Sequence, residues 1–326
     1  MSRQISGFKP TGHLQLGNYL GAIAPAVQAQ HQADLSVFVA DLHAMTVEHE
    51  PARLAALTRE VATLLLAAGL DPGKCTFFVQ SQVPEHAELH YLLECATSYG
   101  EAHRMIQFKE KAATQQQVRL SLLTYPVMMA SDILLYDIDE VPVGDDQSQH
   151  LELTRDVATR FNGRYGQTFV VPKVVLPAFA ARLMDLSDPG AKMGKTNTSD
   201  AGVLFLLDPP EVSRRKVMRA TTDGRREVRY DPVAQPGVAN LLDLLASCVN
   251  DTPHALAGLF SSYAELKEAV ADVVVATLRP IQQRYADLVA DPAGIDTVLR
   301  DGAERARDRA SGTVRRVRRA LGLLSG

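Results

Sequence analysis

The chain has 326 residues, 46% hydrophobic and 22% charged, with a formal net charge of −4 at pH 7. This length suits about two domains, and the composition is that of a globular protein rather than a disordered one. The net negative charge argues against a protein that coats nucleic acid, so any such contact must come from local basic patches. No CxxC pair occurs among the three cysteines, which disfavours a zinc site or a disulfide framework. We expect a cytoplasmic protein without a signal peptide or membrane span.

The N-terminal stretch predicts a strand, a glycine turn and a helix. Residues 3–8 are strand-like, residues 7–12 form a glycine-bounded turn, and apolar residues recur at helical spacing from position 16. Because a helix N-terminus presents free N–H groups and a partial positive charge, this arrangement suits a phosphate. The turn is not a P-loop, since His13 stands where the lysine must be, and it is not GxGxxG. Glycines alone fit a plain turn equally well.

Two further buried strands are predicted at residues 35–40 and 75–80, with a helix over 51–68 between them. The resulting βαβαβ order predicts an α/β fold with a parallel, doubly wound sheet. Asp41 and His43 come directly after the second strand, at the edge where open α/β sheets bind ligands. A turn aspartate and a surface histidine explain these two residues equally well.

His86 and His90 stand four residues apart in a polar helical segment over residues 84–117. They could share a metal ion, but no third ligand is apparent nearby. We therefore expect them on the surface or at an interface, and we expect no protein-held metal.

Asp132 is the unusual residue of a strongly apolar helix predicted over residues 122–135. A carboxylate among apolar neighbours needs a partner, because burial without one is costly. Asp132 either lies on the wet face of this helix or accepts a hydrogen bond from a buried ligand N–H. The residues alone leave both interpretations open.

The second half of the chain changes character near residue 190. Strands are predicted at residues 140–143 and 168–175, and helical periods dominate from residue 210 onward. The predicted helical segments are 238–245, 263–278, 281–288 and 303–321. We therefore predict one domain over residues 1–188 and a helical domain over 189–326.

Two kinds of basic stretch could meet an anion. Lys192 and Lys195 flank a small pivot just after the turn-rich run at 185–190, which suits an anionic ligand. Residues 211–230 and 301–326 each hold seven basic and three acidic residues. Solvated helix faces are the simpler explanation for the last two stretches.

Four stretches then carry a family resemblance. Residues 6–12 (SGFKPTG) with the following LGNY resemble the N-terminal ATP motif of class I aminoacyl-tRNA synthetases, and residues 192–196 (KMGKT) resemble their KMSKS loop. Residues 122–136 and 141–156 are similar to bacterial tryptophanyl-tRNA synthetases in particular. The likeness runs almost end to end. The short motifs define the class, whereas the two long segments specify the amino acid.

The resemblance implies a Rossmann-type catalytic domain with an inserted helical connective segment at about 84–120. An all-helical anticodon-binding domain would follow, with a last helix able to pack back on the catalytic domain. The implied reaction is ATP-dependent activation of L-tryptophan to tryptophanyl-adenylate, followed by transfer to tRNA(Trp). The resemblance also implies a homodimer, and Mg²⁺ that accompanies the triphosphate.

Site residues follow from the same resemblance, position by position. The implied catalytic residues are Lys192, Lys195 and Asn18. The implied ATP contacts are Lys9, Thr11, Gly17, Asn18, Gly144, Asp146, Gln147, Leu183, Lys192, Met193 and Lys195. The implied tryptophan contacts are Ile5, Gly7, His43, Tyr125, Met129, Asp132, Val141, Val143 and Gln147, with Asp132 accepting the indole N–H. A tRNA substrate would explain the basic stretch at 211–230. The implied tRNA contacts in that stretch are Arg214, Arg215 and Arg219.

Five positions depart from the family pattern. Lys9 replaces a glutamine, Gln15 a histidine or threonine, Ile5 an aromatic residue, and Gly194 and Thr196 the two serines of the lysine loop. An extra cation at Lys9 would favour the triphosphate and repel the substrate ammonium. Gly194 removes a hydroxyl and loosens the loop.

Three alternatives remain open at this point. A tyrosyl-tRNA synthetase shares the fold and a lysine loop, and a small adenylyltransferase shares the ATP chemistry but is usually shorter. A non-catalytic paralogue that binds tryptophan or RNA as a regulator is the third, and the altered lysine loop favours it.

Overall fold

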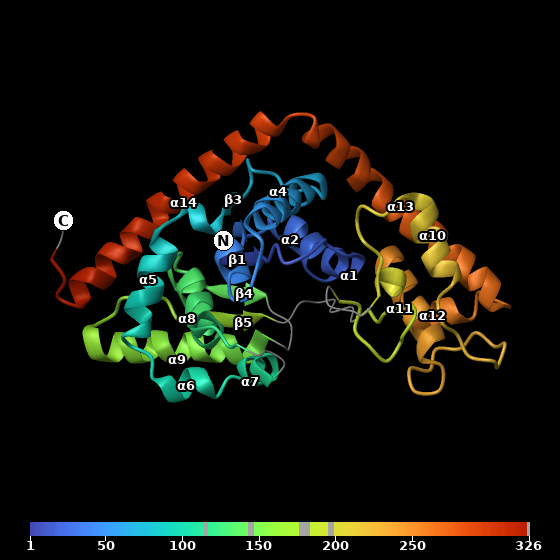
Figure 1. The fold of residues 1–326 in the computed structure, drawn as a ribbon, viewed down its shortest axis with the longest axis horizontal. Coiled ribbons are helices and arrows are strands. Elements are labelled where there is room, and N and C mark those ends of the chain that lie inside the picture. Colours follow the sequence, from blue (N-terminus) through green and yellow to red (C-terminus); the bar gives the residue numbers. More distant parts are fainter. Residues whose placement is uncertain (114–116, 143–146, 176–182, 195–198, 325–326) are drawn as a thin grey trace.

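The computed structural model describes residues 1–113, 117–142, 147–175, 183–194 and 199–324. A five-stranded sheet forms the centre of the N-terminal half (Figure 1). In spatial order its strands are β3 (Thr76–Val79), β2 (Asp34–Val39), β1 (Arg3–Phe8), β4 (Glu140–Pro142) and β5 (Lys173–Val175), and all neighbours are parallel. The predicted parallel, doubly wound sheet is therefore confirmed.

The direction of the strand order reverses at β1. This strand pairs with β2 along its whole length, with Phe8 opposite Val39 at the carboxyl end, but with β4 only at Gln4 opposite Glu140. In open α/β sheets, ligands bind outside the carboxyl ends of the strands at such a reversal. The topology therefore directs attention to the carboxyl ends of β1 and its two neighbours, β2 and β4.

The strand predicted over residues 168–175 is wrong for its first five residues, because β5 begins only at Lys173. The Asn162 side chain takes the backbone partners there. Its Oδ1 accepts from the N–H groups of Thr168 and Phe169 at 2.9 Å each, and its Nδ2 donates to the Phe169 oxygen at 2.9 Å. These backbone groups bind an asparagine side chain instead of a neighbouring strand.

Helices pack around the sheet, and local sequence explains several of their ends. Helix α4 begins at Pro51, where the Glu50 carboxylate caps it, and its path stops at Gly69, whose φ of +112° suits a glycine. The helical elements of this half are α1 (Leu16–Asn18), η1 (Tyr19–Ile23), α2 (Ala24–Ala29), α3 (Asp41–Ala44), α4 (Pro51–Ala67), η2 (Gln80–Gln82), α5 (Glu85–Glu94), α6 (Tyr99–His103), α7 (Ile106–Ala113), α8 (Leu120–Leu134) and α9 (Ser148–Tyr165).

The remaining chain is helical, as predicted. Its elements are η4 (Asp200–Gly202), α10 (Pro210–Met218), α11 (Pro236–Val249), α12 (Pro253–Ala257), α13 (Tyr263–Val289) and α14 (Pro292–Ala320). The two helices predicted at 263–278 and 281–288 are one helix, α13, which continues through Pro280. Leu278 and Ile281 on either side of the proline are both buried, so packing holds the helix together across it.

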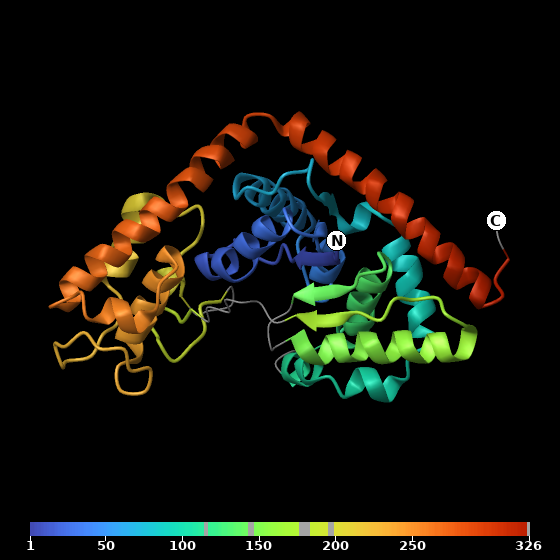
Figure 2. The ribbon, with the colours of Figure 1, turned by 180° about the vertical axis from the view of Figure 1, so that it is seen from behind.

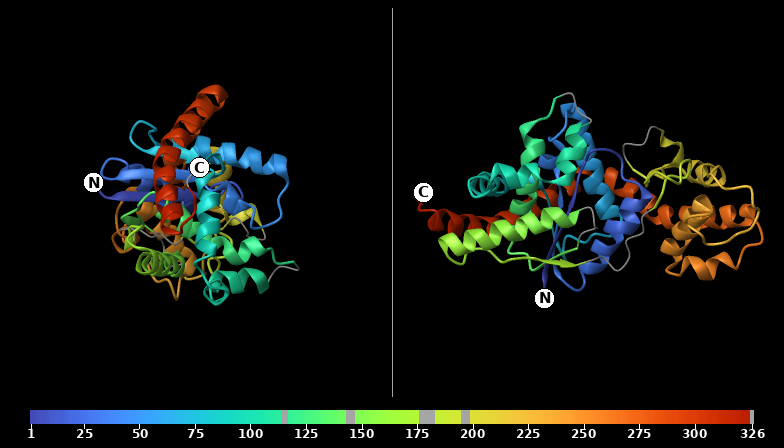
Figure 3. Two further views of the ribbon diagram at one scale, coloured as in Figure 1. Left: turned by 90° about the vertical axis from the view of Figure 1, so that its left-hand side faces the viewer. Right: turned by 90° about the horizontal axis from the view of Figure 1, so that it is seen from below.

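Helices α13 and α14 form an arch over the sheet half (Figures 1 and 2). Seen from below, α10–α13 gather beside that half while α14 runs back across it (Figure 3). A Cβ atom at Gly302 of α14 would lie only 1.6 Å from the backbone oxygen of Phe77, so the helix lies directly on the edge strand β3. In the described parts of the chain, no helix combines the length and apolar character that crossing a membrane requires.

Candidate active site

Asp132 is the centre of a buried polar cluster near the end of α8. Its side chain is almost fully buried, with 3% relative exposure. Gln80 donates from Nε2 to Oδ1 at 2.7 Å, and His86 Nδ1 lies 2.6 Å from the same oxygen. His43 Nε2 lies 2.7 Å from Oδ2. The wet-face interpretation of Asp132 is therefore wrong.

The partners of Asp132 come from the carboxyl ends of neighbouring strands. His43 lies on α3, directly after β2, and Gln80 comes directly after β3. The surface interpretation is wrong for His43, which has only 5% exposure. Its neighbour Asp41 is not a plain turn residue either, because it begins α3 and accepts from the backbone N–H of Ser81 at 2.9 Å. Position at the sheet edge thus indicated His43 correctly.

His86 was predicted on the surface or at an interface, and this prediction is wrong. The residue is fully buried, whereas His90 one turn later is half-buried and pairs with Glu94 at 3.0 Å. Leu89 and Leu93 of α5 are also fully buried. The inward face of α5 therefore includes His86, because positions 86, 89 and 93 follow the helical period.

The charge states in this cluster follow from burial and contact. Burial raises the pKa of Asp132, but the charges and hydrogen bonds of His43 and His86 outweigh it and hold this pKa at about 2. Burial lowers the pKa of His43, against the opposing effect of the Asp132 carboxylate. Asp132 is thus an anion at pH 7, and because a carboxylate can only accept, His43 donates to it from Nε2. Its Nδ1 has no partner among the described residues.

A second polar chain adjoins the first through Tyr125. Tyr125 Oη lies 2.9 Å from Gln107 Oε1 and 3.0 Å from His150 Nε2. The other ring nitrogen of His150 lies 3.0 Å from Gln147 Oε1. The structure therefore connects two predicted site residues, Tyr125 and Gln147, through His150.

Lys9 and His43 complete this group. The rings of His43 and Tyr125 meet edge-on with centroids 6.4 Å apart, and Lys9 Nζ lies 5.0 Å from the centre of the Tyr125 ring. The Lys9 charge also helps to lower the pKa of His43, although burial is the main cause. The extra cation of this chain therefore lies beside the polar cluster.

The apolar residues assigned to the pocket lie close by in the fold. Ile5 of β1 and Val141 of β4 are buried in one hydrophobic core, against which Met129 of α8 packs. Gly7 faces the Phe38 ring, whose Cζ would lie 2.6 Å from a Cβ atom at this position. Four assigned residues lie outside the described part of the chain: Val143, Gly144, Asp146 and Lys195.

The ATP motif contains a reciprocal helix cap. Gln15 Oε1 accepts from the Gly17 N–H, and Asn18 Oδ1 accepts from the Gln15 N–H at 3.1 Å. A Cβ atom at Gly17 would lie 2.8 Å from Gln15 Oε1, so a glycine leaves room for the capping side chain. Thr11 is exposed in the preceding turn. Gln15 thus fills a structural role at the start of α1.

Hydrogen bonds from three parts of the chain fix the backbone of the lysine loop and the strand-like segment beside it. Met193 is buried, and its N–H donates to the Leu183 oxygen at 3.0 Å, while its own oxygen accepts from Gln15 Nε2 at 3.1 Å. The Asn240 side chain of α11 binds both backbone groups of Met184, at 2.8 and 2.9 Å. Lys192 is exposed. The ATP motif, the loop and the helical half therefore meet at these residues.

The two basic stretches differ in their surroundings. On α10, Arg215 is exposed and Arg214 is ion-paired with Asp272 of α13, and Arg219 is exposed directly after this helix. The arginines of α14 mostly bind the sheet half. Their contacts are Arg307 with the Gln82 oxygen, Arg309 with Asp34, Arg316 with Asp137 and Arg318 with Glu88. Most of these arginines therefore hold α14 against the sheet half.

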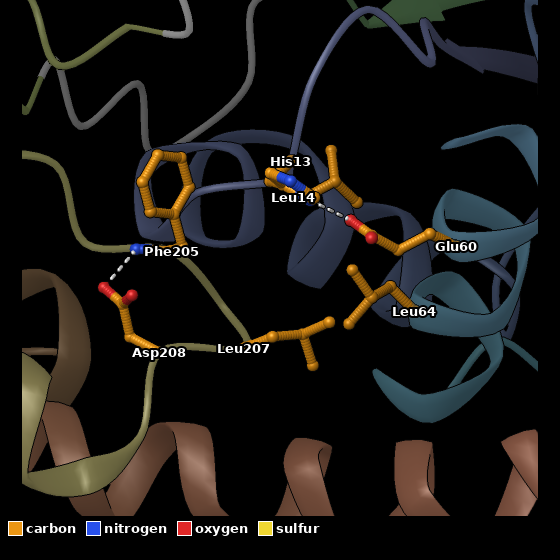
Figure 4. A pocket seen from close by; sticks show the side chains of 7 residues that line it. All are labelled: His13, Leu14, Glu60, Leu64, Phe205, Leu207 and Asp208. Atoms are coloured by element: carbon orange, nitrogen blue, oxygen red, sulfur yellow. Dashed lines mark hydrogen bonds and ion pairs between the residues drawn. The ribbon is translucent and has the colours of Figure 1, made fainter. Parts of the chain in front are cut away.

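A pocket of about 210 Å³ lies where the ATP motif meets the segment before α10 (Figure 4). His13 and Glu60 face each other across it at 2.7 Å, and Phe205 packs edge-on to the His13 ring. Leu14, Leu64, Leu207 and Asp208 complete the lining. None of these residues belongs to the Asp132 cluster, so this pocket is a junction between the two halves of the chain.

Comparison with known proteins places this arrangement in a family. Residues 2–279 match the family model of tRNA synthetases class I (W and Y). The chain is 57% identical to tryptophan–tRNA ligase 1 of Streptomyces avermitilis, over 99% of each protein.

Two solved structures are similar over nearly their whole length. The tryptophanyl-tRNA synthetase of Mycoplasma pneumoniae has 37% identity and a TM-score of 0.91, covering 100% of this chain and 99% of that one. The Campylobacter jejuni enzyme, complexed with ADP and tryptophan, has 30% identity and a TM-score of 0.84, covering 98% and 100%. The resemblance stated from the sequence is thereby confirmed. The chain belongs to the class I tRNA synthetases for tryptophan and tyrosine, and within them to the bacterial tryptophan–tRNA ligases.

Proposed function

We propose that this chain joins L-tryptophan to tRNA(Trp) with ATP. The carboxylate of tryptophan attacks the α-phosphorus of ATP, the bond to the β-phosphate oxygen breaks, and pyrophosphate leaves. A ribose hydroxyl at the end of tRNA(Trp) then attacks the adenylate carbonyl, AMP leaves, and tryptophanyl-tRNA forms. No protein nucleophile is needed in either step.

The observation that carries the proposal is the ionised, buried Asp132. Among the described residues three donors surround it, and a carboxylate offers about four acceptor positions, so one is left there for a ligand. An indole N–H donates and does not accept, so an acceptor alone satisfies it. A phenol hydroxyl also accepts, and a carboxylate cannot supply that second partner. The cluster therefore favours tryptophan over tyrosine.

Catalysis would come from positioning and charge. We assign the developing charge on pyrophosphate to Lys192 and Lys195. Because Asn18 Oδ1 is engaged in the helix cap, its amide group is the part that would donate to a phosphate. Lys9 beside Tyr125 adds a further cation for the triphosphate.

The other proposed contacts follow the positions given by the resemblance. For ATP they are Thr11, Gly17, Gly144, Asp146, Gln147, Leu183 and Met193. For tryptophan they are Ile5, Gly7, His43, Tyr125, Met129, Val141, Val143 and Gln147. The link from Tyr125 through His150 to Gln147 supports a shared pocket for both substrates.

Mg²⁺ would bind with the triphosphate and neutralise part of its charge. Among the described residues, no group of three histidine, cysteine, aspartate or glutamate side chains could hold a metal ion.

We further propose that residues 1–188 form the catalytic domain, with the connective insertion at about 84–120, and that residues 189–326 bind the anticodon part of tRNA. A homodimer is proposed from the resemblance. The free thiols of Cys75, Cys95 and Cys248 fit the cytoplasm, which is reducing.

Tryptophan-dependent exchange of pyrophosphate into ATP tests the proposal. We expect exchange with tryptophan and none with tyrosine, and Asp132→Asn should lower the tryptophan kcat/KM by about 100-fold or more. Asp156→Asn changes an exposed carboxylate on α9 and serves as the matched control, with unchanged exchange. Exchange with tyrosine alone would identify a tyrosyl enzyme. If neither tryptophan nor tyrosine supports pyrophosphate exchange, the protein would be the non-catalytic paralogue.

A further inference from the structure

We propose that Gln80 and His86 are positioning residues that fix the direction in which Asp132 accepts a hydrogen bond, with His86 oriented by Tyr136. They would thereby determine the selectivity of the pocket for a ring N–H. This inference rests on the proposed function, since it concerns the same pocket.

The two oxygens of Asp132 are unequally occupied. Oδ1 meets two donors, Gln80 Nε2 at 2.7 Å and His86 Nδ1 at 2.6 Å. Oδ2 meets one, His43 Nε2 at 2.7 Å. Since each carboxylate oxygen accepts about two hydrogen bonds, Oδ1 is full and Oδ2 has one position left within the described structure. A ligand N–H therefore has one oxygen and one direction available to it.

Tyr136 orients the His86 ring from the other side. Its hydroxyl lies 2.8 Å from His86 Nε2, and both side chains are buried. Because the ionised Asp132 carboxylate can only accept, His86 carries a hydrogen on Nδ1. The Tyr136 hydroxyl, whose pKa burial raises well above its ordinary value, keeps its proton and can donate it to Nε2. The contacts thus select one tautomer of the ring.

Aromatic rings hold His86 in place as well. The Phe38 and Phe78 rings each lie 5.8 Å from the His86 ring, centroid to centroid. Phe38 takes this position only because Gly7 of β1 has no side chain, as a Cβ atom there would lie 2.6 Å from its Cζ. Gly7 therefore acts on the pocket through Phe38 and His86.

A purely structural role makes a different prediction from a positioning role. If the network only stabilises the fold, its loss affects every substrate alike. If the network orients the Asp132 carboxylate, its loss affects only substrates that donate a ring N–H. An analogue of tryptophan in which sulfur replaces the ring N–H, benzothienyl-alanine, separates the two.

The experiment compares His86→Gln and Tyr136→Phe with a control, His90→Gln, one helical turn away. In pyrophosphate exchange we expect KM for tryptophan to rise by about 10-fold to 100-fold in His86→Gln and by about 5-fold in Tyr136→Phe, with kcat nearly unchanged. KM for the sulfur analogue should stay constant in both variants. His90→Gln should match the wild type with both substrates. Equal losses for tryptophan and the analogue would overturn the proposal.

Two measurements do not depend on exchange. The chain contains no tryptophan, so the fluorescence of bound L-tryptophan reports its affinity directly, and this affinity should follow the KM values. Nitrogen NMR of labelled wild-type protein should show the hydrogen of His86 on Nδ1. A hydrogen on Nε2 would contradict this inference alone, whereas a wild type that folds and shows this tautomer but lacks exchange would contradict the proposed function.

Discussion

The side-chain amide of Gln15 donates to the backbone oxygen of Met193 at 3.1 Å, across 178 positions of the sequence. The same side chain caps α1 by accepting from the Gly17 N–H. One residue therefore joins the start of the ATP motif to the lysine loop.

Replacing Gln15 separates these two contacts. Gln15→Glu keeps the acceptor for Gly17 and loses the donor to Met193, so the loop is released while the helix cap remains. Trypsin should then cleave after the exposed Lys192 several-fold faster, with little change in melting temperature. Gln15→Ala also loses the cap, which should lower the free energy of unfolding by about 1 kcal/mol. Equal cleavage rates in the wild type and both variants would remove the role assigned to this contact.

The lowered pKa of Asp132 makes the free energy of unfolding depend on pH in the acid range. Its folded pKa of about 2 lies below its ordinary value of 3.8, so the unfolded chain takes up the proton first as pH falls. This contribution to stability is fully present above the ordinary value and is lost as pH falls toward 2, by about 2 kcal/mol. Urea denaturation across this range should show the loss in the wild type and a flatter curve in Asp132→Asn. Parallel curves would contradict the assignment.

His43 should act in a higher pH window. Burial lowers its folded pKa below its ordinary value of 6.5. The unfolded chain therefore gains the proton first as pH falls through that value, and stability decreases. Removing the imidazole in His43→Asn should abolish this part of the slope. The same slope in both proteins would show that His43 is protonated in the folded state.

Arg215 on α10 and Arg219 directly after it should contact tRNA. Their combined reversal to glutamate should lower aminoacylation by about 10-fold or more, because phosphate contacts are electrostatic, while pyrophosphate exchange stays unchanged. Arg315 and Arg319, which are exposed at the end of α14, give a control with the same change in charge. Loss of exchange in the α10 variant would make that surface structural or catalytic instead.

Gly302 and Gly312 provide a matched pair within α14. Alanine at Gly302 would place Cβ 1.6 Å from the Phe77 oxygen and force the helix away from β3, whereas a Cβ atom at Gly312 meets nothing within 4 Å. We expect Gly302→Ala to lower the free energy of unfolding by about 3 kcal/mol or more and Gly312→Ala to raise it by about 0.5–1 kcal/mol. Similar effects at both positions would show that α14 does not lie against β3.

Local patterns were sufficient for the architecture. The alternation of buried strands with helical periods predicted the parallel sheet. The place of His43 after a strand left its position open between the sheet edge and the surface, and the structure buries it at the sheet edge. Where these patterns failed, another local interaction competed. Asn162 takes the backbone partners of residues 168 and 169, and packing carries α13 through Pro280.

The cluster around Asp132 was only partly predictable. His86 could have been found, because it shares a helical face with Leu89 and Leu93. Gln80 could also have been found, because it follows a buried strand as His43 does. The contact between Gln15 and Met193 leaves no local pattern, since it depends on how the two halves of the chain meet.

Charging of tRNA(Trp) by the purified protein tests the central claim most directly. With ATP, Mg²⁺ and labelled amino acid, we predict that tryptophan, and not tyrosine, becomes ester-linked to tRNA(Trp). A protein that charges this tRNA with tyrosine, or binds tryptophan and charges no tRNA at all, would contradict the account.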